Sequence, residues 1–316
     1  MPVRRAVDKY RTNSSQLKAE CVYLILSDSE DQCSFRVRGA LEASGFRSVT
    51  IANPMIDPAR FRWHLDSEVC RSEVEFPQQP PISLDDIGGV LVRSHGWLDP
   101  HGWESGDLAY VQAEMQAAML AWMWSLHCPV INRYPPGIWY RPQIPLLCWQ
   151  KLLVNCGLQT SEILITNVEQ ETLALREHLN SKGVVGAFYG PLTSHGGYLV
   201  TDEKEWCGLA NLQNVAPVCL AEPHGEATLV CVVGERILWR GVPSRDMTRL
   251  EPNLNRFAVE AGLDFVELAL APADDSIRVV AVEPQPHFEW FDTSAQQQIV
   301  DGLVHLLTTG KESGFC

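Results

Sequence analysis

The stretch CVYLILS at residues 21–27 is a continuous apolar run with polar residues on both sides. A short run without alternation is typical of a parallel strand that is buried on both faces. The tripeptide at 29–31, Ser-Glu-Asp, offers a helix N-cap with acidic residues in the first turn. We expect a helix from there to about Ser44, ended by Gly45. The stretch therefore predicts the first strand and helix of an α/β layer.

The rest of the first half continues this pattern. Phe46–Ala52 and Ile87–Arg93 are predicted strands, and a long helix from about Tyr110 to His127 leads into Pro129–Arg133. Strands that alternate with helices indicate a parallel sheet. Residues 1–20 are polar and are expected to form a flexible tail. We therefore assign an N-terminal α/β domain to residues 21–133.

The segment 134–145 is rich in proline, which prevents a regular helix, so we place a linker there. The region beyond it, 146–310, changes character. Two hairpins are predicted around the turns at Gly234 and at residues 273–276, and both are antiparallel. Other strands and helices are expected between them, which makes this region α+β. The remaining expected elements are strands at 162–166, 183–192, 198–201 and 218–222 and helices at 146–156, 169–180, 203–212, 253–261 and 294–307.

Composition and charge exclude several classes of protein. The chain has 316 residues, 46% of them hydrophobic, so it is long enough to bury a sizeable core. Its net charge is −14, whereas nucleic-acid-binding proteins typically carry an excess of positive charge. It contains no apolar run of membrane-spanning length and no secretory signal pattern. Its ten cysteines are scattered without a C-x-x-C pair, which favours a reducing compartment. We expect a soluble cytoplasmic protein.

The segment Ser94–Glu104 brings together several side chains that can bind a metal ion. Their spacing matches no sharp motif, and a surface loop with tryptophans is the alternative interpretation. A metal-dependent enzyme at this segment stays open as a third hypothesis. The side chains are those of His95, Asp99, His101 and Glu104.

A glycine-rich turn joins the predicted strands at 183–192 and 198–201. Backbone N–H groups in such a turn can hold a phosphate, although paired glycines are also common in hairpin turns. The turn is our candidate cofactor-binding segment. Its residues are Thr193, Ser194, His195, Gly196 and Gly197.

Glu283 and Gln285 end the last predicted strand. Side chains two residues apart on an extended chain point the same way. Two oxygen ligands in this arrangement suit a magnesium ion, although an amide is a weaker ligand than a carboxylate. The alternative is a strand end with two exposed polar residues. Glu283 and Gln285 are our candidate metal ligands.

Six phrases follow one another along nearly the whole chain: GVLVR (89–93), PVINR (129–133), SEILITN (161–167), GAFYGPLTSHGG (186–197), TLVCVVGERILW (228–239) and VEPQPHFEWF (282–291). In this order they resemble phrases of the ATP-grasp superfamily. The resemblance is greatest to the branch of ribosomal-protein glutamate ligases and of ligases that macrocyclise ribosomal peptides. It implies an N-terminal parallel domain followed by two α+β subdomains with antiparallel hairpins.

The resemblance also implies a chemistry. In this superfamily ATP phosphorylates a carboxylate, and an amine attacks the acyl-phosphate to give an amide. Two lysines hold the nucleotide, an arginine steadies the acyl-phosphate, and magnesium lies on an aspartate, a glutamate and an asparagine. Such cations are needed because charge shifts onto the leaving phosphates.

This chain departs from that pattern at most of these positions. The two lysine positions fall on Leu146 and Ala187, and the arginine position falls on Leu229. At the metal positions, Ala269 stands for the aspartate and Gln285 for the asparagine, and the glutamate is Glu283. A register slip would bring in a nearby replacement, Lys151, Lys182 or Glu267. Losing several transition-state donors together should leave little chemistry.

One basic cluster in this half, Arg240, Arg245 and Arg249, follows the first hairpin. Arg245 and Arg249 are candidate catalytic residues that would orient a substrate acid, and the alternative is a solvated loop.

The leading hypothesis is a non-catalytic pseudo-ligase with an eroded site. It would bind a peptide or protein, or pair with an active ATP-grasp paralogue, and it could be oligomeric. The alternative is an active ATP- and magnesium-dependent carboxylate–amine ligase with relocated cations.

Overall fold

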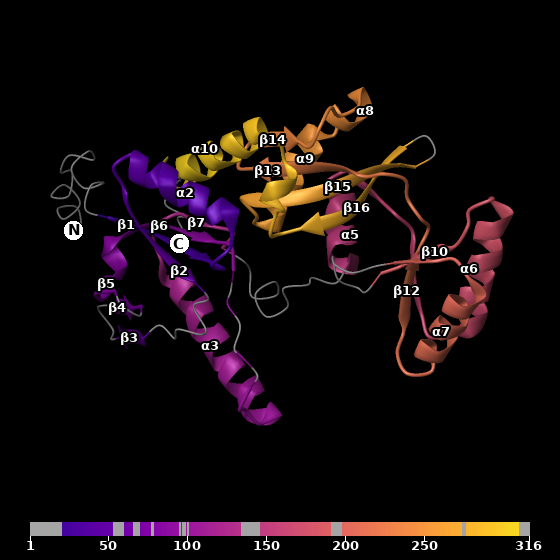
Figure 1. Ribbon diagram of the computed structural model, residues 1–316, viewed down its shortest axis with the longest axis horizontal. Helices are drawn as coiled ribbons and strands as arrows, with labels where there is room; N and C mark the ends of the chain where they lie inside the picture. Colours follow the sequence, from indigo (N-terminus) through magenta and orange to yellow (C-terminus); the bar gives the residue numbers. More distant parts are fainter. Residues whose placement is uncertain are drawn as a thin grey trace, which may run out of the picture. The chain divides into compact units, whose positions relative to one another are not determined.

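The computed structural model describes residues 21–52, 60–65, 70–76, 79–94, 96, 99, 101–133, 146–190, 198–273 and 276–309. The chain divides into two compact units (Figure 1). Unit 1 comprises residues 1–140 and 293–316, and unit 2 comprises residues 141–292. The expected tail at 1–20 and linker at 134–145 lie outside the described residues. Among the helices that the structure describes, none combines the length and apolar character needed to cross a membrane.

Unit 1 is built on a parallel sheet. Its strands are β1 (Val22–Ser27), β2 (Arg47–Ala52), β6 (Ile87–Val92) and β7 (Val130–Ile131), in the order β2-β1-β6-β7. Every neighbouring pair is parallel. All six residues of β1 are buried, as expected for a central strand of such a sheet. The structure confirms the α/β fold predicted for the first half.

Helices α2 (Gln32–Ala43) and α10 (Thr293–Thr309) lie side by side on this sheet (Figure 1). The first packs on β1 and β2, and the second packs on β6 and β7. The end of the chain therefore belongs to unit 1, whereas we had expected one region at 146–310. An amphipathic pattern shows that a helix covers a core, but not which core it covers. The long helix α3 (Ser105–Ser125) begins five residues before the expected start at Tyr110.

Close packing holds α10 on unit 1. A Cβ atom on Gly89 of β6 would lie 3.1 Å from the carbonyl oxygen of Leu307 and 3.2 Å from its Cδ2 atom. The guanidinium group of Arg36 donates hydrogen bonds of 2.8 Å to Oε1 of Gln296 and to Oε1 of Gln297. Only a glycine at position 89 lets the helix approach the sheet this closely.

A buried ion pair fixes the start of α2. The carboxylate of Asp31 accepts a 2.9 Å hydrogen bond from the backbone N–H of Ser34, which makes it the N-cap. Arg93, at the end of β6, donates to the same carboxylate from Nη2 at 3.0 Å and from Nε at 3.2 Å. Burial alone would raise the pKa of Asp31, but the charge and hydrogen bonds of Arg93 and Ser34 outweigh it and lower this pKa.

A small antiparallel sheet in unit 1 was not predicted. Its strands are β3 (Arg60–Leu65), β4 (Cys70–Glu75) and β5 (Ile82–Ser83), in that order, followed by the short 3-10 helix η1 (Leu84–Asp86). The sequence RFRWHL of β3 alternates polar and apolar residues, so a period of two was the signal that could have identified it.

Unit 2 contains two sheets, of which the first is antiparallel. Its strands are β9 (Ile163–Thr166), β10 (Ala187–Tyr189), β11 (Tyr198–Val200) and β12 (Val218–Ala221), in the order β11-β10-β12-β9. We call it sheet D. Within the described part of the strand expected at 183–192, which is 183–190, only the three residues of β10 form a strand.

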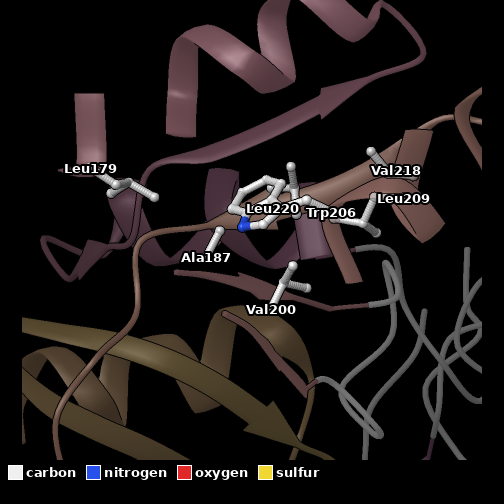
Figure 2. Packing of buried hydrophobic residues seen from close by; sticks show 7 residues of the cluster. All are labelled: Leu179, Ala187, Val200, Trp206, Leu209, Val218 and Leu220. Atoms are coloured by element: carbon white, nitrogen blue, oxygen red, sulfur yellow. The ribbon is translucent and has the colours of Figure 1, made fainter. Parts of the chain in front are cut away.

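Helices α6 (Glu169–Ser181) and α7 (Glu203–Gln213) pack against sheet D. Asp202 and Glu205 form a capping box that begins α7. Figure 2 shows the buried apolar cluster between these helices and the sheet. The cluster comprises Leu179, Ala187, Val200, Trp206, Leu209, Val218 and Leu220.

The second sheet of unit 2, sheet C, holds both predicted hairpins. Its order is β14-β13-β15-β16-β8. The first hairpin is β13 (Thr228–Val233) with β14 (Arg236–Trp239), and the second is β15 (Phe265–Ala273) with β16 (Ser276–Glu283). The short strand β8 (Gln159–Thr160) pairs with β16 in parallel and was not predicted.

Helices α5 (Leu146–Asn155) and α9 (Glu251–Ala261) cover one side of sheet C. The rings of Trp149 and Phe257 meet edge to face between them, with centroids 5.6 Å apart. A one-turn helix, α8 (Arg245–Thr248), precedes α9. The helices predicted at 146–156 and 253–261 are confirmed as α5 and α9, and α9 starts two residues before the expected 253.

Candidate functional site

The two faces of sheet C differ in character. On β15 the alternate residues Val266, Leu268 and Leu270 are fully buried and apolar, as expected for the face that the helices cover. The intervening residues Glu267 and Ala269 point to the other face. We call it the acidic face, because Glu267 and its partner on β16 lie there.

Glu267 lies directly opposite Glu283 in the pairing of β15 with β16. The two residues are only 3% and 7% exposed. The resemblance had placed the metal aspartate on Ala269, but Ala269 pairs with Ala281. By pairing, the residue opposite Glu283 is Glu267, so Glu267 becomes our candidate for the second metal-binding acid.

A β-bulge puts both acids on one face. The register shifts between Ala269 and Leu270, which pair with Ala281 and Val279, so Val280 has no opposite residue. Without this extra residue Glu267 would lie opposite Val282, and Glu283 would point to the helix-covered face. The bulge was not visible in the sequence pattern, which is why Glu267 was only a fallback candidate there.

Gln285, the second candidate ligand, follows Glu283 in a turn. Its backbone N–H donates a 2.8 Å hydrogen bond to Oε1 of Glu283, so the carboxylate also fixes its own turn. Within the described ranges, no group of three or more His, Cys, Asp and Glu side chains could hold a metal ion alone. Two carboxylates do suit magnesium, which typically takes one or two carboxylates plus phosphate oxygens and water. The two carboxylates therefore fit a divalent cation whose remaining ligands are water molecules or phosphate oxygens.

His287 contacts Glu267 at two points. Its backbone N–H donates to Oε2 at 3.1 Å, and its Nδ1 atom lies 3.0 Å from Oε1. The imidazole stacks on the ring of Trp290, with centroids 3.8 Å apart and planes 6° from parallel. Trp290 ends the short 3-10 helix η2 (Phe288–Trp290). The sequence analysis quoted these residues only as part of the phrase VEPQPHFEWF (282–291) and gave them no role.

A cavity of about 200 Å³ lies towards the other end of the acidic face. It is lined by residues that follow β12, among them Glu222 and His224, and by Ala271 and Arg278 of sheet C. Oε2 of Glu222 lies 3.4 Å from Nη1 of Arg278, and Oε1 of Glu222 lies 3.8 Å from Nζ of Lys182. Lys182, a fallback candidate for a family lysine, is therefore engaged with this carboxylate.

The resemblance placed its second lysine position on Ala187, which is the first residue of strand β10. Ala187 is fully buried in the apolar cluster beside Trp206 (Figure 2). Phe188 points to the other side of sheet D, where its ring lies 5.8 Å from that of His224. The strand reads Ala-Phe-Tyr, so a slip of one or two residues within it restores no cation. Lys151, the other fallback candidate, is exposed on α5, the helix that packs on α9.

Arg240 shares the acidic face. Its backbone N–H donates a 2.9 Å hydrogen bond to the carbonyl oxygen of Leu229, so the two residues lie opposite each other. Leu229 pairs with Ala269, which shares its face with Glu267. The guanidinium of Arg240 is thus on the strand next to Leu229, where the resemblance placed the arginine. Counting outward from the turn at Gly234 and Glu235 would have identified this pairing.

The candidate catalytic residues Arg245 and Arg249 lie elsewhere. Arg249 lines a groove of about 700 Å³ together with Pro272 and Ile277, whose side chains belong to the helix-covered side. Its Nη1 atom donates to Asp246 at 2.8 Å. Position 272 is five residues from Glu267, roughly 16 Å along the strand. The structure does not bring Arg249 to Glu283 and Gln285, and Arg245 is exposed on α8.

Two other candidates can be placed only in part. The turn at 193–197, our cofactor-binding segment, lies outside the described residues, as does His95. The side chain of Asp99 accepts a 2.9 Å hydrogen bond from the backbone N–H of His101, and Asp99, His101 and Glu104 are exposed. This bond stabilises a loop, and these three residues form no metal-binding group.

No protein-family model and no curated protein matches this chain. Solved structures match it along nearly its whole length. The macrocyclase MdnC from Microcystis aeruginosa MRC, bound with precursor peptide MdnA, has a TM-score of 0.71 at 16% identity, covering 92% of this chain and 100% of that chain. A RiPP-associated ATP-grasp ligase from Chryseobacterium gregarium, in complex with ADP and a leader and core peptide, has a TM-score of 0.70 at 14% identity, covering 91% and 96%.

A RimK domain ATP-grasp protein from Sphaerobacter thermophilus DSM 20745 has a TM-score of 0.58 at 14% identity, covering 92% of this chain and 99% of that chain. Similarity at these identities reports the fold. The chain has the ATP-grasp fold, and it resembles the branch to which its sequence phrases pointed.

Proposed function

We propose that this chain is a peptide-binding protein with the ATP-grasp fold, which keeps a pair of carboxylates for a divalent cation but no longer forms amide bonds. Strand β10 carries this proposal. Its sequence Ala187-Phe188-Tyr189 offers no cation to a nucleotide phosphate at any register, and Ala187 is part of an apolar core.

The remaining charges support the loss of nucleotide chemistry. A triphosphate carries several negative charges and needs positioned cations in the transition state. Among the described residues of the acidic face, the cations are Arg240 and Arg278, and Arg278 is engaged with Glu222. The two buried carboxylates add negative charge at the end where the phosphates would lie. Phosphate transfer would therefore be slow or absent.

Peptide binding is proposed by comparison with structures of the same fold. The macrocyclase MdnC is bound with a precursor peptide, and the Chryseobacterium gregarium ligase holds a leader and a core peptide. This chain keeps the fold along nearly its whole length, while its nucleotide site is altered. We therefore propose that it retains peptide binding. The partner would be a peptide or an active paralogue that modifies it.

The acid pair favours a second candidate, an active carboxylate–amine ligase. Glu267 and Glu283 would hold magnesium, which when bound neutralises phosphate charge. Arg240 would bind the oxygens of the substrate carboxylate from the same face. In the reaction, that carboxylate attacks the terminal phosphorus of ATP, ADP leaves, and an amine then displaces phosphate to form the amide.

Thermal unfolding with millimolar ATP and magnesium separates the two candidates. A ligand at about 100 times its Kd stabilises the native state by about 2.7 kcal/mol, which is easily seen as a shift in Tm. We expect no magnesium-dependent shift beyond that given by magnesium alone, and no ADP release. Magnesium-dependent stabilisation by ATP, together with ADP release, would contradict the proposal and support the ligase.

Peptide binding is tested separately with a random peptide library displayed on phage. We expect selection on the full chain to enrich a consensus sequence. Binding of that consensus as a synthetic peptide, measured by fluorescence anisotropy, would support the proposal. A library that enriches no binder would count against a peptide partner and favour a protein one.

A further inference from the structure

His287 supplies two donors to one buried carboxylate. The backbone N–H lies 3.1 Å from Oε2 of Glu267, and Nδ1 lies 3.0 Å from Oε1. An ionised carboxylate only accepts hydrogen bonds, so we assign the proton of this contact to Nδ1. Both oxygens are therefore held by one residue, and the plane of the carboxylate is fixed.

His287 is held in place in turn. Its ring stacks on Trp290, and the neighbouring residues Phe288 and Phe291 are buried, at 1% and 3% exposure. The two phenylalanines anchor the segment in the core, and the stacked ring limits the rotation of the imidazole. The contact with Glu267 is thus built on a rigid segment.

We infer that His287 is a positioning residue, which holds the carboxylate of Glu267 in the orientation that lets Glu267 and Glu283 bind one divalent cation. Two buried carboxylates at directly opposite positions repel each other, so without a donor Glu267 would rotate away from Glu283. Each oxygen that accepts one bond from His287 keeps further acceptor capacity for a cation. Such supporting contacts orient metal ligands in general.

This inference rests on the cation pair of the proposed function and adds to it. The resemblance assigned the metal to the segment ending at Gln285, and it gave no role to the residue two positions later. The inference concerns only the acid pair, so its test needs no nucleotide and no peptide.

The test is a titration of the full chain with Mn²⁺, which reports binding through the electron paramagnetic resonance signal of the free ion. His287→Phe keeps an aromatic ring against Trp290 and removes the Nδ1 donor. We expect it to weaken Mn²⁺ binding about tenfold. His287→Asn places an amide donor near the position of Nδ1, and we expect it to restore binding to within about threefold of the wild type.

Phe291→Leu is the control for stability. It removes a buried ring from the same segment and leaves the donor in place, so we expect a lower Tm with unchanged Mn²⁺ affinity. Wild-type affinity in His287→Phe would overturn the positioning role. Equal losses in His287→Phe and His287→Asn would also overturn it, because packing alone would then explain the effect.

A wild-type chain that does not bind Mn²⁺ would overturn both this inference and the proposed cation pair. ATP turnover by the wild type would contradict only the proposed function, because the positioning of Glu267 would remain. The two failures are therefore distinguishable.

Discussion

Glu267 and Glu283 lie directly opposite each other on β15 and β16, and both are buried on the same face of the sheet. Like charges in this arrangement destabilise the fold unless a partner neutralises them. A soluble domain that needed only stability would place apolar residues at these two positions. The pair is therefore the best starting point for experiments on this chain.

Replacing one acid of the pair should separate cation binding from folding. We expect Glu283→Gln to weaken Mn²⁺ binding at least tenfold, because it removes a charged ligand. The same change removes the repulsion with Glu267, so the Tm without metal should be unchanged or higher. Isothermal titration calorimetry and thermal unfolding measure the two effects. Unchanged Mn²⁺ affinity in this variant would show that the pair is not the cation site.

Lysine substitutions on β10 should have opposite outcomes at neighbouring positions. Ala187→Lys buries a charge in the apolar cluster, and we expect a loss of about 3 kcal/mol in unfolding free energy. Phe188→Lys points to the side of sheet D that bears His224, so the chain should remain folded. We expect this second variant to gain ATP binding that the wild type lacks, because a charge-assisted hydrogen bond is added.

Urea denaturation measures the first effect, and a fluorescent ATP analogue measures the second. Phe188→Met is the matched control, because it changes the side chain without adding charge. Equal stability of Ala187→Lys and the wild type would show that Ala187 is not enclosed as described.

The ion pair of Asp31 and Arg93 should make the free energy of unfolding of unit 1 depend on pH. Because the pKa of Asp31 is lowered in the folded state, this carboxylate stabilises the fold above its unfolded pKa of about 4 and loses that contribution as the pH falls through its folded value. Asp31→Asn can still cap the helix but removes the charged carboxylate that Arg93 binds. We expect it to cost about 3 kcal/mol at pH 7.

Denaturant unfolding of both proteins between pH 7 and pH 2 checks this prediction. The difference between wild type and Asp31→Asn should be constant at neutral pH and should shrink below about pH 4. A difference that does not change with pH would mean that the charge of Asp31 contributes little.

Two glycine-to-alanine substitutions in unit 1 should have opposite effects on the stability of the fold. A Cβ atom on Gly89 would press on Leu307 of α10, so Gly89→Ala should destabilise the fold by about 2 kcal/mol. Gly39 lies inside α2, and apart from its own helix backbone and chain neighbours no atom of the described residues lies within 4 Å of an added Cβ, so Gly39→Ala should stabilise by about 0.5–1 kcal/mol. Thermal unfolding of both variants gives the comparison. Destabilisation by both would mean that the contact with α10 is not the cause.

Most elements of the fold could be predicted from local patterns. The buried run at β1, the glycine that ends α2 and the turn at Gly234 each act within a few residues, so their signals are present in the sequence itself. The small sheet of unit 1 was missed because β3 and β4 carry many polar and charged residues, although they are as long as the predicted strands. The assignment of α10 to unit 1 was missed because a helix pattern does not identify its partner.

The candidate site was predicted less completely. Glu283 and Gln285 were proposed because they end the predicted strand, but β16 ends at Glu283 and Gln285 follows in a turn, where its backbone N–H donates to Glu283. Glu267 and His287 were not assigned, because their contact joins residues 20 positions apart across a hairpin. Arg249 was proposed from its place in the sequence, but in the structure it lines a groove with Pro272 on the helix-covered side.

The sequence by itself determined most of the strands and helices in their order along the chain, and the absence of a cation on β10, since no register of Ala-Phe-Tyr supplies one. Only the tertiary structure decided which carboxylates face each other. That decision depends on one extra residue, Val280, at the bulge in β16. Side chains alternate along a strand, so a shift of one residue moves every later side chain to the opposite face. Cross-strand register, which local sequence does not encode, therefore places Glu283 beside Glu267.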